Sequence, residues 1–356
     1  MRLIVMPCDG IGPEITKAAI EVMDAADKRF GLGLSYDFED TGFVSLEKHG
    51  TTLRQEVLDK ARDYDGIILG TQSHNEYPAP EKGGRNVSAS FRVGLDLYAN
   101  IRPARSRPYL PTNMSAGKTM DLVIMRECTE GFYADRNMTR GWGEVMPSPD
   151  MALATRKITR HASERIARDS FELAMRRKKR VTAIHKANCF LMTCGLFLET
   201  VRGVAKDFPL VAYEEMLVDA STAHIVRTPE RFDVLCATNF FGDILSDLAS
   251  ELSGSIGLAG SVNASHTHCC AQAQHGSAPD IAGKNIANPT SMILSCAMLL
   301  DWGATRYGRP ALAQAAKAME AAVDAVLADP DSRTRYLGGQ INCDAFGRLV
   351  AKAVAA

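Results

Sequence analysis

Two aspartates stand four positions apart in the segment NFFGDILSDLASEL, as Asp243 and Asp247. On a helix, residues at this spacing share one face about one turn apart, where two like charges cost stability unless a cation lies between them. Carboxylate oxygens are the ligands that divalent cations such as Mg²⁺ prefer. Phe240, Phe241 and Ile244 are close in sequence. This apolar setting favours a metal site over two solvated acids.

Three arginines lie on stretches of the chain that can converge in the fold. Arg92 and Arg102 belong to FRVGLDLYANIRP, and Arg126 belongs to MRECTEGFY. A guanidinium binds a carboxylate through a planar, two-pronged contact. The set therefore indicates a substrate with more than one carboxylate, and three separate surface ion pairs are the alternative.

A lysine and an aspartate each follow a strand-like stretch. Lys186 comes directly after VTAIH. A lysine near apolar groups and a metal can have its pKa lowered enough to act as a general base; a surface lysine is the alternative. Asp219, in MLVDAST, can be a third metal ligand or a helix N-cap.

The segment CDGIGPEI, residues 8–15, places two glycines after a strand and before a helix, with Pro13 at the first helical position. Such a turn can cradle a phosphate. However, it is not a GxGxxG motif, and a tight strand–helix connection explains it equally well.

The elements that must position these residues alternate between strand-like and helix-like patterns. The expected strands are residues 3–7, 34–39, 65–70, 121–127, 181–185, 209–217 and 233–238. The expected helices are residues 13–29, 53–62, 161–178, 190–205, 243–252, 290–302 and 310–328. This alternation predicts an α/β fold with a largely parallel sheet. We expect short strands and turns over 141–160 and irregular structure over 253–288.

The composition is that of an ordinary globular protein. The chain has 356 residues, 46% hydrophobic and 23% charged, which suggests two or three domains. A net charge of −1 gives no reason to expect nucleic acid or a membrane surface as partner. The sequence lacks an apolar run of about 20 residues and a signal-peptide core, so we expect a cytoplasmic protein. The nine cysteines fit reduced, buried thiols, and the cluster at 266–270 matches no common zinc spacing.

Taken together, these segments resemble the β-decarboxylating dehydrogenases, the isopropylmalate and isocitrate dehydrogenase family, and most closely its isopropylmalate branch. The matching stretches, in order, are DGIGPEI, LYANIRP, RECTEGFY, HKAN, VDA, NFFGDILSDLASELSGSIGLAGS and HGSAPDIAGKNIANPTSMILS. The resemblance implies two α/β domains around a central cleft, with a non-Rossmann mode of NAD binding. It implies a large domain of residues 1–97 and 251–356 that carries the NAD-binding loop. Residues 98–250 would form a small domain with dimer-forming helices and an arm near 141–160.

The activity that the resemblance implies is a metal-dependent oxidative decarboxylation of a 3-substituted malate by an NAD-dependent oxidoreductase. The implied residues are substrate-binding Arg92, Arg102 and Arg126, catalytic Tyr133 and Lys186, and the Mg²⁺ or Mn²⁺ ligands Asp219, Asp243 and Asp247. Tyr133 would protonate the enol carbon, and Lys186 would help to remove the hydroxyl proton. In this family Lys186 and Asp219 of one subunit complete the site of the other, which implies a homodimer.

The residue set counts against two other readings. A non-catalytic regulatory subunit of a hetero-oligomer would be expected to have lost part of this residue set. A phosphate-ester dehydrogenase of the same general fold would be expected to have histidine metal ligands, which these positions lack.

Asp280 bears on the choice of cofactor. The resemblance places it at the adenosine ribose, where a carboxylate accepts hydrogen bonds from both hydroxyls of NAD and repels the 2′-phosphate of NADP. We therefore expect NAD. The other residues expected at the cofactor are Ile11, His275, Gly276, Ser277, Ala278 and Asn288. Asn288 would also cap the helix that begins with Pro289.

The side group of the malate should contact residues one to two turns before Arg92. Arg85 and Ser88 stand there, in GGRNVSASFR. Small and polar residues suit a hydroxyl or carboxylate better than a branched alkyl group. Arg85 can bind the third carboxylate of isocitrate or homoisocitrate, and an exposed loop arginine is the alternative. Isopropylmalate, tartrate and D-malate also stay open.

Overall fold

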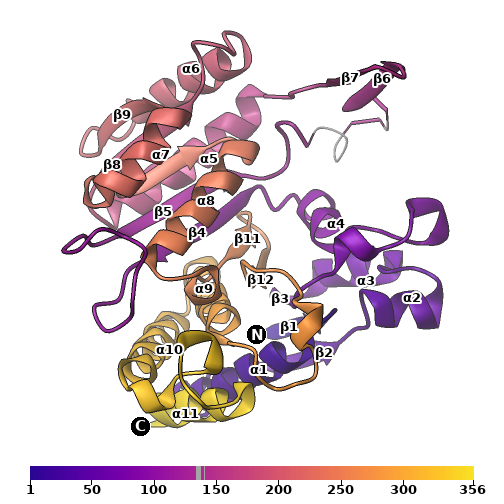
Figure 1. Ribbon diagram of the computed structural model, residues 1–356, viewed down its shortest axis with the longest axis vertical. Coiled ribbons are helices and arrows are strands. Elements are labelled where there is room, and N and C mark those ends of the chain that lie inside the picture. The colour runs from indigo at the N-terminus through magenta and orange to yellow at the C-terminus, as the bar shows by residue number, and fades with distance from the viewer. Residues whose placement is uncertain (134–137, 140) are drawn as a thin grey trace. The chain divides into compact units, whose positions relative to one another are not determined.

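The computed structural model describes residues 1–133, 138–139 and 141–356 (Figure 1). The chain divides into two compact units. The first unit is Met1–Leu95 with Ile256–Ala356, and the second is Asp96–Ser255. The limits expected from the sequence, at 97/98 and 250/251, lie a few residues from these.

Five strands of the main sheet, which has ten strands among the described residues, belong to the first unit. In spatial order they are β2 (Ser35–Phe38), β1 (Arg2–Met6), β3 (Gly66–Leu69), β12 (Cys269–Gln272) and β11 (Val262–Ala264). The pairings β2–β1, β1–β3 and β3–β12 are parallel, whereas β11 and β12 form an antiparallel hairpin. All of β3 and all of β1 after Arg2 are buried, which explains their continuous apolar sequence.

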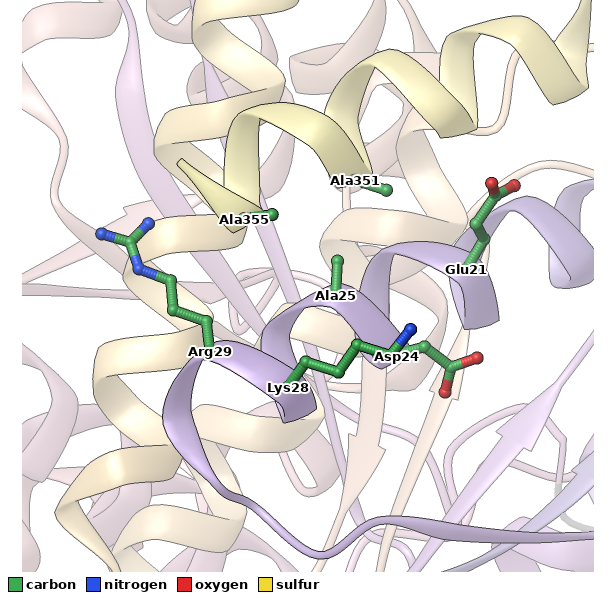
Figure 2. Close-up of a pocket in the computed structure, with 7 residues that line it drawn as sticks. All are labelled: Glu21, Asp24, Ala25, Lys28, Arg29, Ala351 and Ala355. Atoms are coloured by element: carbon green, nitrogen blue, oxygen red, sulfur yellow. The ribbon is translucent and has the colours of Figure 1, made fainter.

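Helices surround this sheet. They are α1 (Gly12–Phe30), α2 (Phe43–His49), α3 (Gln55–Lys60), α4 (Val87–Gly94), α9 (Thr290–Tyr307), α10 (Pro310–Ala328) and α11 (Cys343–Ala355). The buried side chains of α1 recur at helical spacing, as Ile15, Ala19, Val22 and Ala26. Helix α1 packs against α11, and α9 packs against α10. A groove of about 490 Å³ between α1 and α11 holds both signs of charge, with Glu21, Asp24, Lys28 and Arg29 beside three alanines (Figure 2).

The second unit has its own five strands. In spatial order they are β4 (Ala99–Arg105), β5 (Asp121–Glu127), β10 (Val234–Ala237), β8 (Arg180–His185) and β9 (Ala212–Leu217). Strands β4 and β5 are antiparallel, and the remaining pairings are parallel. The unit's helices are α5 (Arg160–Met175), α6 (Thr193–Ala205), α7 (Val218–Arg227) and α8 (Asn239–Ser253).

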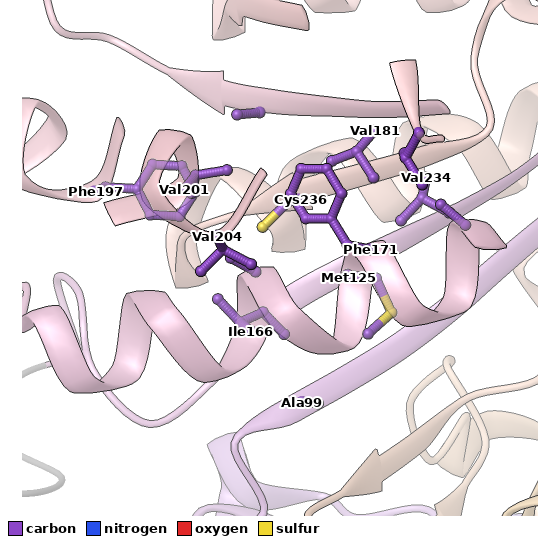
Figure 3. Packing of buried hydrophobic residues seen from close by; sticks show 14 of the residues in the cluster. Ala99, Met125, Ile166, Phe171, Val181, Phe197, Val201, Val204, Val234 and Cys236 are labelled. Carbon is purple, nitrogen blue, oxygen red and sulfur yellow. The ribbon is translucent and has the colours of Figure 1, made fainter. Parts of the chain in front are cut away.

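Strand alternation gives the strands of the second unit two different faces. Val123 and Met125 of β5 pack with Phe171 of α5 and Phe197 of α6 in one core (Figure 3). Leu122 and Ile124 point the other way, into a core shared with Phe241 and Leu245 of α8. Arg126 continues this second series, so it lies on the face that α8 covers.

A two-stranded ribbon of β6 (Glu144–Ser148) and β7 (Met151–Ala154) belongs to the second unit. Nearly all of its residues are exposed, including the large apolar Met146 and Leu153. Leu191 and Met192, before α6, are 72% and 85% exposed. The second unit therefore presents apolar side chains that its own core does not cover.

The predicted α/β fold is confirmed, with several corrections. Residues 253–288 are not wholly irregular, because they contain the β11–β12 hairpin. Its turn holds His266 and His268, whereas Cys269 and Cys270 are buried in β12. Helix α8 begins at Asn239 rather than Asp243. None of the helices in the described residues is long and apolar enough to span a membrane.

Candidate active site

The second unit brings together five of the expected site residues, Arg102, Arg126, Tyr133, Asp243 and Asp247. Arg102 of β4 donates through Nη1 to Asp243 Oδ1 and to Asp247 Oδ1, both at 3.3 Å. Arg126 of β5 also donates to Asp243 Oδ1. The two carboxylates of α8 thus have a cation between them, as their spacing requires, and that cation is a guanidinium.

Local sequence explains how these groups meet. Arg102 pairs with Ile124 across the β4–β5 ladder, so its side chain lies on the same face as that of Arg126. Helix α8 then crosses close to β5 at Gly242, where an added Cβ would lie 2.7 Å from the Cβ of Arg126. A glycine at 242 therefore allows the aspartates to approach both arginines.

Tyr133 and Asn239 complete this cluster. The Tyr133 hydroxyl donates to Asp243 Oδ2 at 3.3 Å. Asn239 is fully buried, and its Oδ1 accepts from Nε and Nη2 of Arg126 at 2.9 and 2.7 Å. Its Nδ2 donates to the carbonyl of Glu130 at 2.8 Å. Asn239 therefore fixes both the guanidinium of Arg126 and the turn that leads to Tyr133.

Asp219 does not join the other two expected metal ligands in this chain. It accepts from Lys186 Nζ at 2.7 Å. Within the ranges that the structure describes, no three His, Cys, Asp or Glu side chains are placed to hold one metal ion. Asp219 also lies in the first turn of α7, where Leu217 is the N-cap residue, so its reading as an N-cap is wrong.

The pKa of Lys186 shifts in the direction opposite to the one expected. The hydrogen bond to Asp219 raises the pKa of Lys186 and lowers the pKa of Asp219. The expectation of a lowered lysine pKa is therefore wrong for this arrangement. Lys186 and Asp219 therefore form an ion pair in which the charged form of each is favoured.

The donor set fits a divalent cation. Asp243 and Asp247 offer carboxylate oxygens, and their side chains are 33% and 61% exposed. Hard oxygen ligands of this kind suit Mg²⁺ or Mn²⁺, and soft cysteine sulfur is absent from the cluster of Arg102, Arg126, Tyr133 and the two aspartates.

Arg92 lies in the first unit, among uncharged groups. Its Nε donates to Asn263 Oδ1 at 2.9 Å, and Asn263 Nδ2 donates to Gln272 Oε1 at 3.2 Å. Ser88, one turn earlier on α4, donates through Oγ to the same Gln272 oxygen at 2.9 Å. Arg92 and Ser88 are therefore joined through two amides.

Arg85 has partners away from Ser88. Its Nη1 donates to the carbonyl of Leu53 at 3.1 Å, and both Nη atoms lie 3.4 Å from Gln55 Oε1. These contacts favour the alternative reading of Arg85 as a loop arginine over its reading as a third carboxylate clamp.

The expected cofactor loop contacts the turn after β1. Ile11 N–H donates to the carbonyl of Ser277 at 2.8 Å. Gly10 has a φ of 60°, and an added Cβ there would lie 2.0 Å from that same carbonyl oxygen. The close approach needs glycine at this position.

Asp280 is exposed, and within the residues that the structure describes its carboxylate makes no hydrogen bond or ion pair; only its main-chain carbonyl accepts from Lys284. It lies in a 3₁₀ turn, Pro279–Ile281, that follows Ala278 at a φ of 42°. This free carboxylate fits the two hydroxyls of a ribose. Burial lowers the pKa of the nearby His275.

Asn288 has a capping role, although not at the expected position. Its Oδ1 accepts from the N–H and hydroxyl of Thr290 at 3.2 and 2.7 Å, and its Nδ2 donates to the carbonyl of Gly257 at 3.3 Å. Helix α9 begins at Thr290 with Pro289 as the N-cap residue, so the predicted cap is displaced by one residue.

Asp9 is a residue that sequence reasoning missed. It is buried and accepts hydrogen bonds from the N–H groups of Phe43 and Ser73 and from the hydroxyl of Tyr77. Ser73 Oγ in turn donates to Ser277 Oγ at 2.8 Å. Asp9 therefore links the turn after β1 to the segment that precedes Ser88 and to the cofactor loop. Its place in CDGIGPEI was the available signal.

Comparisons with known proteins agree with this geometry. The family profile described as Isocitrate/isopropylmalate dehydrogenase matches residues 2–350. An isocitrate/homoisocitrate dehydrogenase of Thermus thermophilus is 41% identical over 99% of this chain and 98% of its own. A 3-isopropylmalate dehydrogenase of Archaeoglobus fulgidus is 39% identical over 98% of each chain. The crystal structure of isocitrate dehydrogenase from Methylococcus capsulatus superposes with a TM-score of 0.87 at 37% identity, covering 100% of this chain and 99% of the other.

Proposed function

Because the chain belongs to the isocitrate/isopropylmalate dehydrogenase family of NAD(P)-dependent β-decarboxylating dehydrogenases, we propose that it oxidises and decarboxylates a 3-substituted malate with NAD. One observation carries the proposal beyond family membership. Asp243 accepts hydrogen bonds from two buried arginines and from the hydroxyl of Tyr133. Anion-binding, metal-binding and proton-donating groups thus meet around one carboxylate.

Arg102 and Arg126 are proposed to bind carboxylates of the substrate, as is Arg92 of the first unit. In the second unit, Asp243 and Asp247 occupy the guanidinium donors that a substrate carboxylate would use. If the two aspartates held a cation, a substrate carboxylate would take over the guanidinium donors. Bidentate guanidinium contacts also fix the orientation of the malate.

Asp219, Asp243 and Asp247 would hold Mg²⁺ or Mn²⁺, with Asp219 supplied by the second subunit. NAD supplies the hydride acceptor, and the cation supplies a Lewis acid for the oxygen that becomes negative as CO₂ leaves.

Lys186 and Tyr133 are proposed to move protons at opposite ends of the reaction. Withdrawal of Asp219 would remove the hydrogen bond that raises the pKa of Lys186, and the amine, once in its neutral form, could accept the proton of the C2 hydroxyl as hydride leaves C2. The resulting β-keto acid loses CO₂, and the enolate that remains takes a proton at C3. Tyr133 donates that proton from its phenol, which Asp243 orients.

The working unit is proposed to be a homodimer with shared active sites. The observation in its support is the set of exposed apolar side chains in the second unit. They include Trp142, Met146 and Leu153 around the β6–β7 ribbon, and Leu191 and Met192 before α6. Large uncovered apolar surfaces mark association sites. Light scattering of the purified protein should give twice the chain mass, and a monomer would contradict the shared site.

A panel of substrates tests the proposed function. The protein with NAD and Mn²⁺ is offered isopropylmalate, isocitrate, homoisocitrate, tartrate and D-malate, and NADH formation is measured for each. Turnover of at least one acid that depends on Mn²⁺ is expected. Absence of turnover with all five would favour the non-catalytic regulatory subunit. We also propose a cytoplasmic location, as expected from the sequence.

A further inference from the structure

The donor and acceptor in each hydrogen bond around Ser88 can be assigned, starting from Arg92. A guanidinium N–H can only donate. Arg92 Nε therefore requires the oxygen of the Asn263 amide on its side, at 2.9 Å. The Asn263 NH₂ group then faces Gln272 and requires its oxygen, at 3.2 Å.

The same logic fixes the proton of Ser88. Gln272 presents Oε1 to Ser88 Oγ at 2.9 Å, so the serine hydroxyl donates its only proton to that oxygen. Ser88 is half-buried on α4. Toward a ligand it can offer only the lone pairs of its oxygen, which accept a hydrogen bond.

Gln72 supplies the complementary donor. A backbone N–H also can only donate, and that of Ser88 donates to Gln72 Oε1 at 2.9 Å. The Gln72 NH₂ group is thereby directed elsewhere. Gln72 is 8% exposed, and its Nε2 is buried without a hydrogen-bond partner among the described residues. Unpaired buried donors are costly, so this group indicates a missing acceptor.

We propose that Gln72 and Ser88 select a malate whose C3 substituent is a hydroxyl group. A hydroxyl can donate to Ser88 Oγ and accept from Gln72 Nε2 at once. A carboxylate accepts only, so it meets the serine lone pairs unfavourably. An alkyl group leaves both polar groups unpaired. The inference rests on the proposed function, because it takes Arg92 as the clamp that brings the malate beside Ser88.

Two further contacts disfavour a carboxylate at this place. The N-terminus of α4 attracts anions through free N–H groups, but those of Ser88 and Ala89 already bind Gln72 Oε1 and Asn86 Oδ1. The guanidinium of Arg85 is bound to the 53–55 segment. The groups around Ser88 are therefore amides and hydroxyls.

The test compares tartrate with D-malate, which lacks a side group, and with isocitrate and isopropylmalate. For the wild-type protein with NAD and Mn²⁺, we expect kcat/KM for one tartrate stereoisomer to exceed that for isocitrate and isopropylmalate at least tenfold. Gln72→Leu should lower kcat/KM for tartrate about 10- to 100-fold, and that for D-malate less than about threefold. Ser88→Ala should likewise lower kcat/KM for tartrate more than kcat/KM for D-malate.

Calorimetric titration with Mn²⁺ and without NAD separates this inference from the proposed function. Tighter binding of tartrate than of D-malate, lost in Gln72→Leu, would support the inference even if no acid is turned over. A preference for isocitrate or isopropylmalate would overturn it, as would equal losses for tartrate and D-malate in Gln72→Leu. Thermal unfolding of each variant establishes that it folds, and Gln72→Glu, which keeps the acceptor for Ser88 N–H and loses the donor, should bind tartrate as poorly as Gln72→Leu.

Discussion

Arg92 in the first unit and Arg102 and Arg126 in the second are all expected to bind substrate carboxylates, yet their neighbours differ in charge. Arg102 and Arg126 contact Asp243, and Arg102 also contacts Asp247. Arg92 meets the amide of Asn263 and, among the described residues, forms no ion pair.

This difference separates two tasks. Carboxylates beside arginines can exchange partners when a cation and an anionic substrate bind. This property suits the cluster of the second unit, which is proposed to hold the metal and the reacting carboxylate. Amides and hydroxyls have fixed hydrogen-bond directions, which suits discrimination between neutral and anionic side groups. The second unit thus carries the proposed chemistry, and the first carries the proposed selection of substrate and cofactor.

The largest expected effect comes from Asp243→Asn. The change removes a metal ligand and the charge that orients Arg102, Arg126 and Tyr133. Loss of several kcal/mol of transition-state stabilisation corresponds to a decrease in kcat of about a thousandfold. Manganese titration should show weaker binding as well. Glu172→Gln, at an exposed carboxylate of α5, is the matched control and should keep full activity.

Asn239→Ala tests whether Arg126 needs its amide support. The guanidinium loses two hydrogen bonds to Asn239 Oδ1. Hydrogen bonds to charged groups contribute about 1.5–3 kcal/mol, so kcat/KM should fall roughly 10- to 100-fold, mainly through KM. Asn239→Asp keeps an oxygen for Arg126 and should recover most of the loss. Equal damage in both variants with an unchanged KM would contradict the role of Asn239 in holding Arg126.

Asp280→Asn should reduce the preference for NAD over NADP. The wild type should use NAD far better than NADP, because the free carboxylate repels the 2′-phosphate. Like-charge contacts cost several kcal/mol, so the ratio of kcat/KM values for NAD and NADP should fall about tenfold or more in the variant. A wild-type preference for NADP would exclude this role of Asp280.

The smallest expected effect is on stability. Burial raises the pKa of Glu130 to about 7, and the neighbouring Glu127 adds to the shift. Between the usual pKa and this raised value, the folded protein holds a proton that the unfolded chain has lost. Stability should therefore fall as pH rises from about 5 to about 7. Glu130→Gln should flatten this decline in thermal unfolding temperature; an unchanged slope would assign it to other groups.

The candidate site residues of the second unit are easier to predict from the sequence than those of the first unit. Asp243 and Asp247 are recognisable because their relation is local, one helical turn. Asn263 and Gln272 are not, because their partners are far away in the chain: Gln272 meets Ser88 across 184 positions, and Asn263 meets Arg92 across 171. The short strands β11 and β12, rich in alanine and cysteine, also gave no alternation that would distinguish them from a loop.

Lys186 shows a different limit of sequence reasoning. An apolar setting predicts a lowered pKa, but a single ion pair with Asp219 reverses the sign. This ion pair forms because the end of β8, which precedes Lys186, lies near the start of α7, which holds Asp219. Composition does not predict such a meeting. The direction of a pKa shift is therefore safer to assign once the neighbours are known.

The most direct test of the account is the product balance of the reaction. The protein is incubated with NAD, Mn²⁺ and the acid that it turns over fastest, and both NADH and CO₂ are measured. The account predicts equal amounts of the two, both lost in Asp243→Asn. Formation of NADH without CO₂, or of neither, would contradict an oxidative decarboxylation at this site.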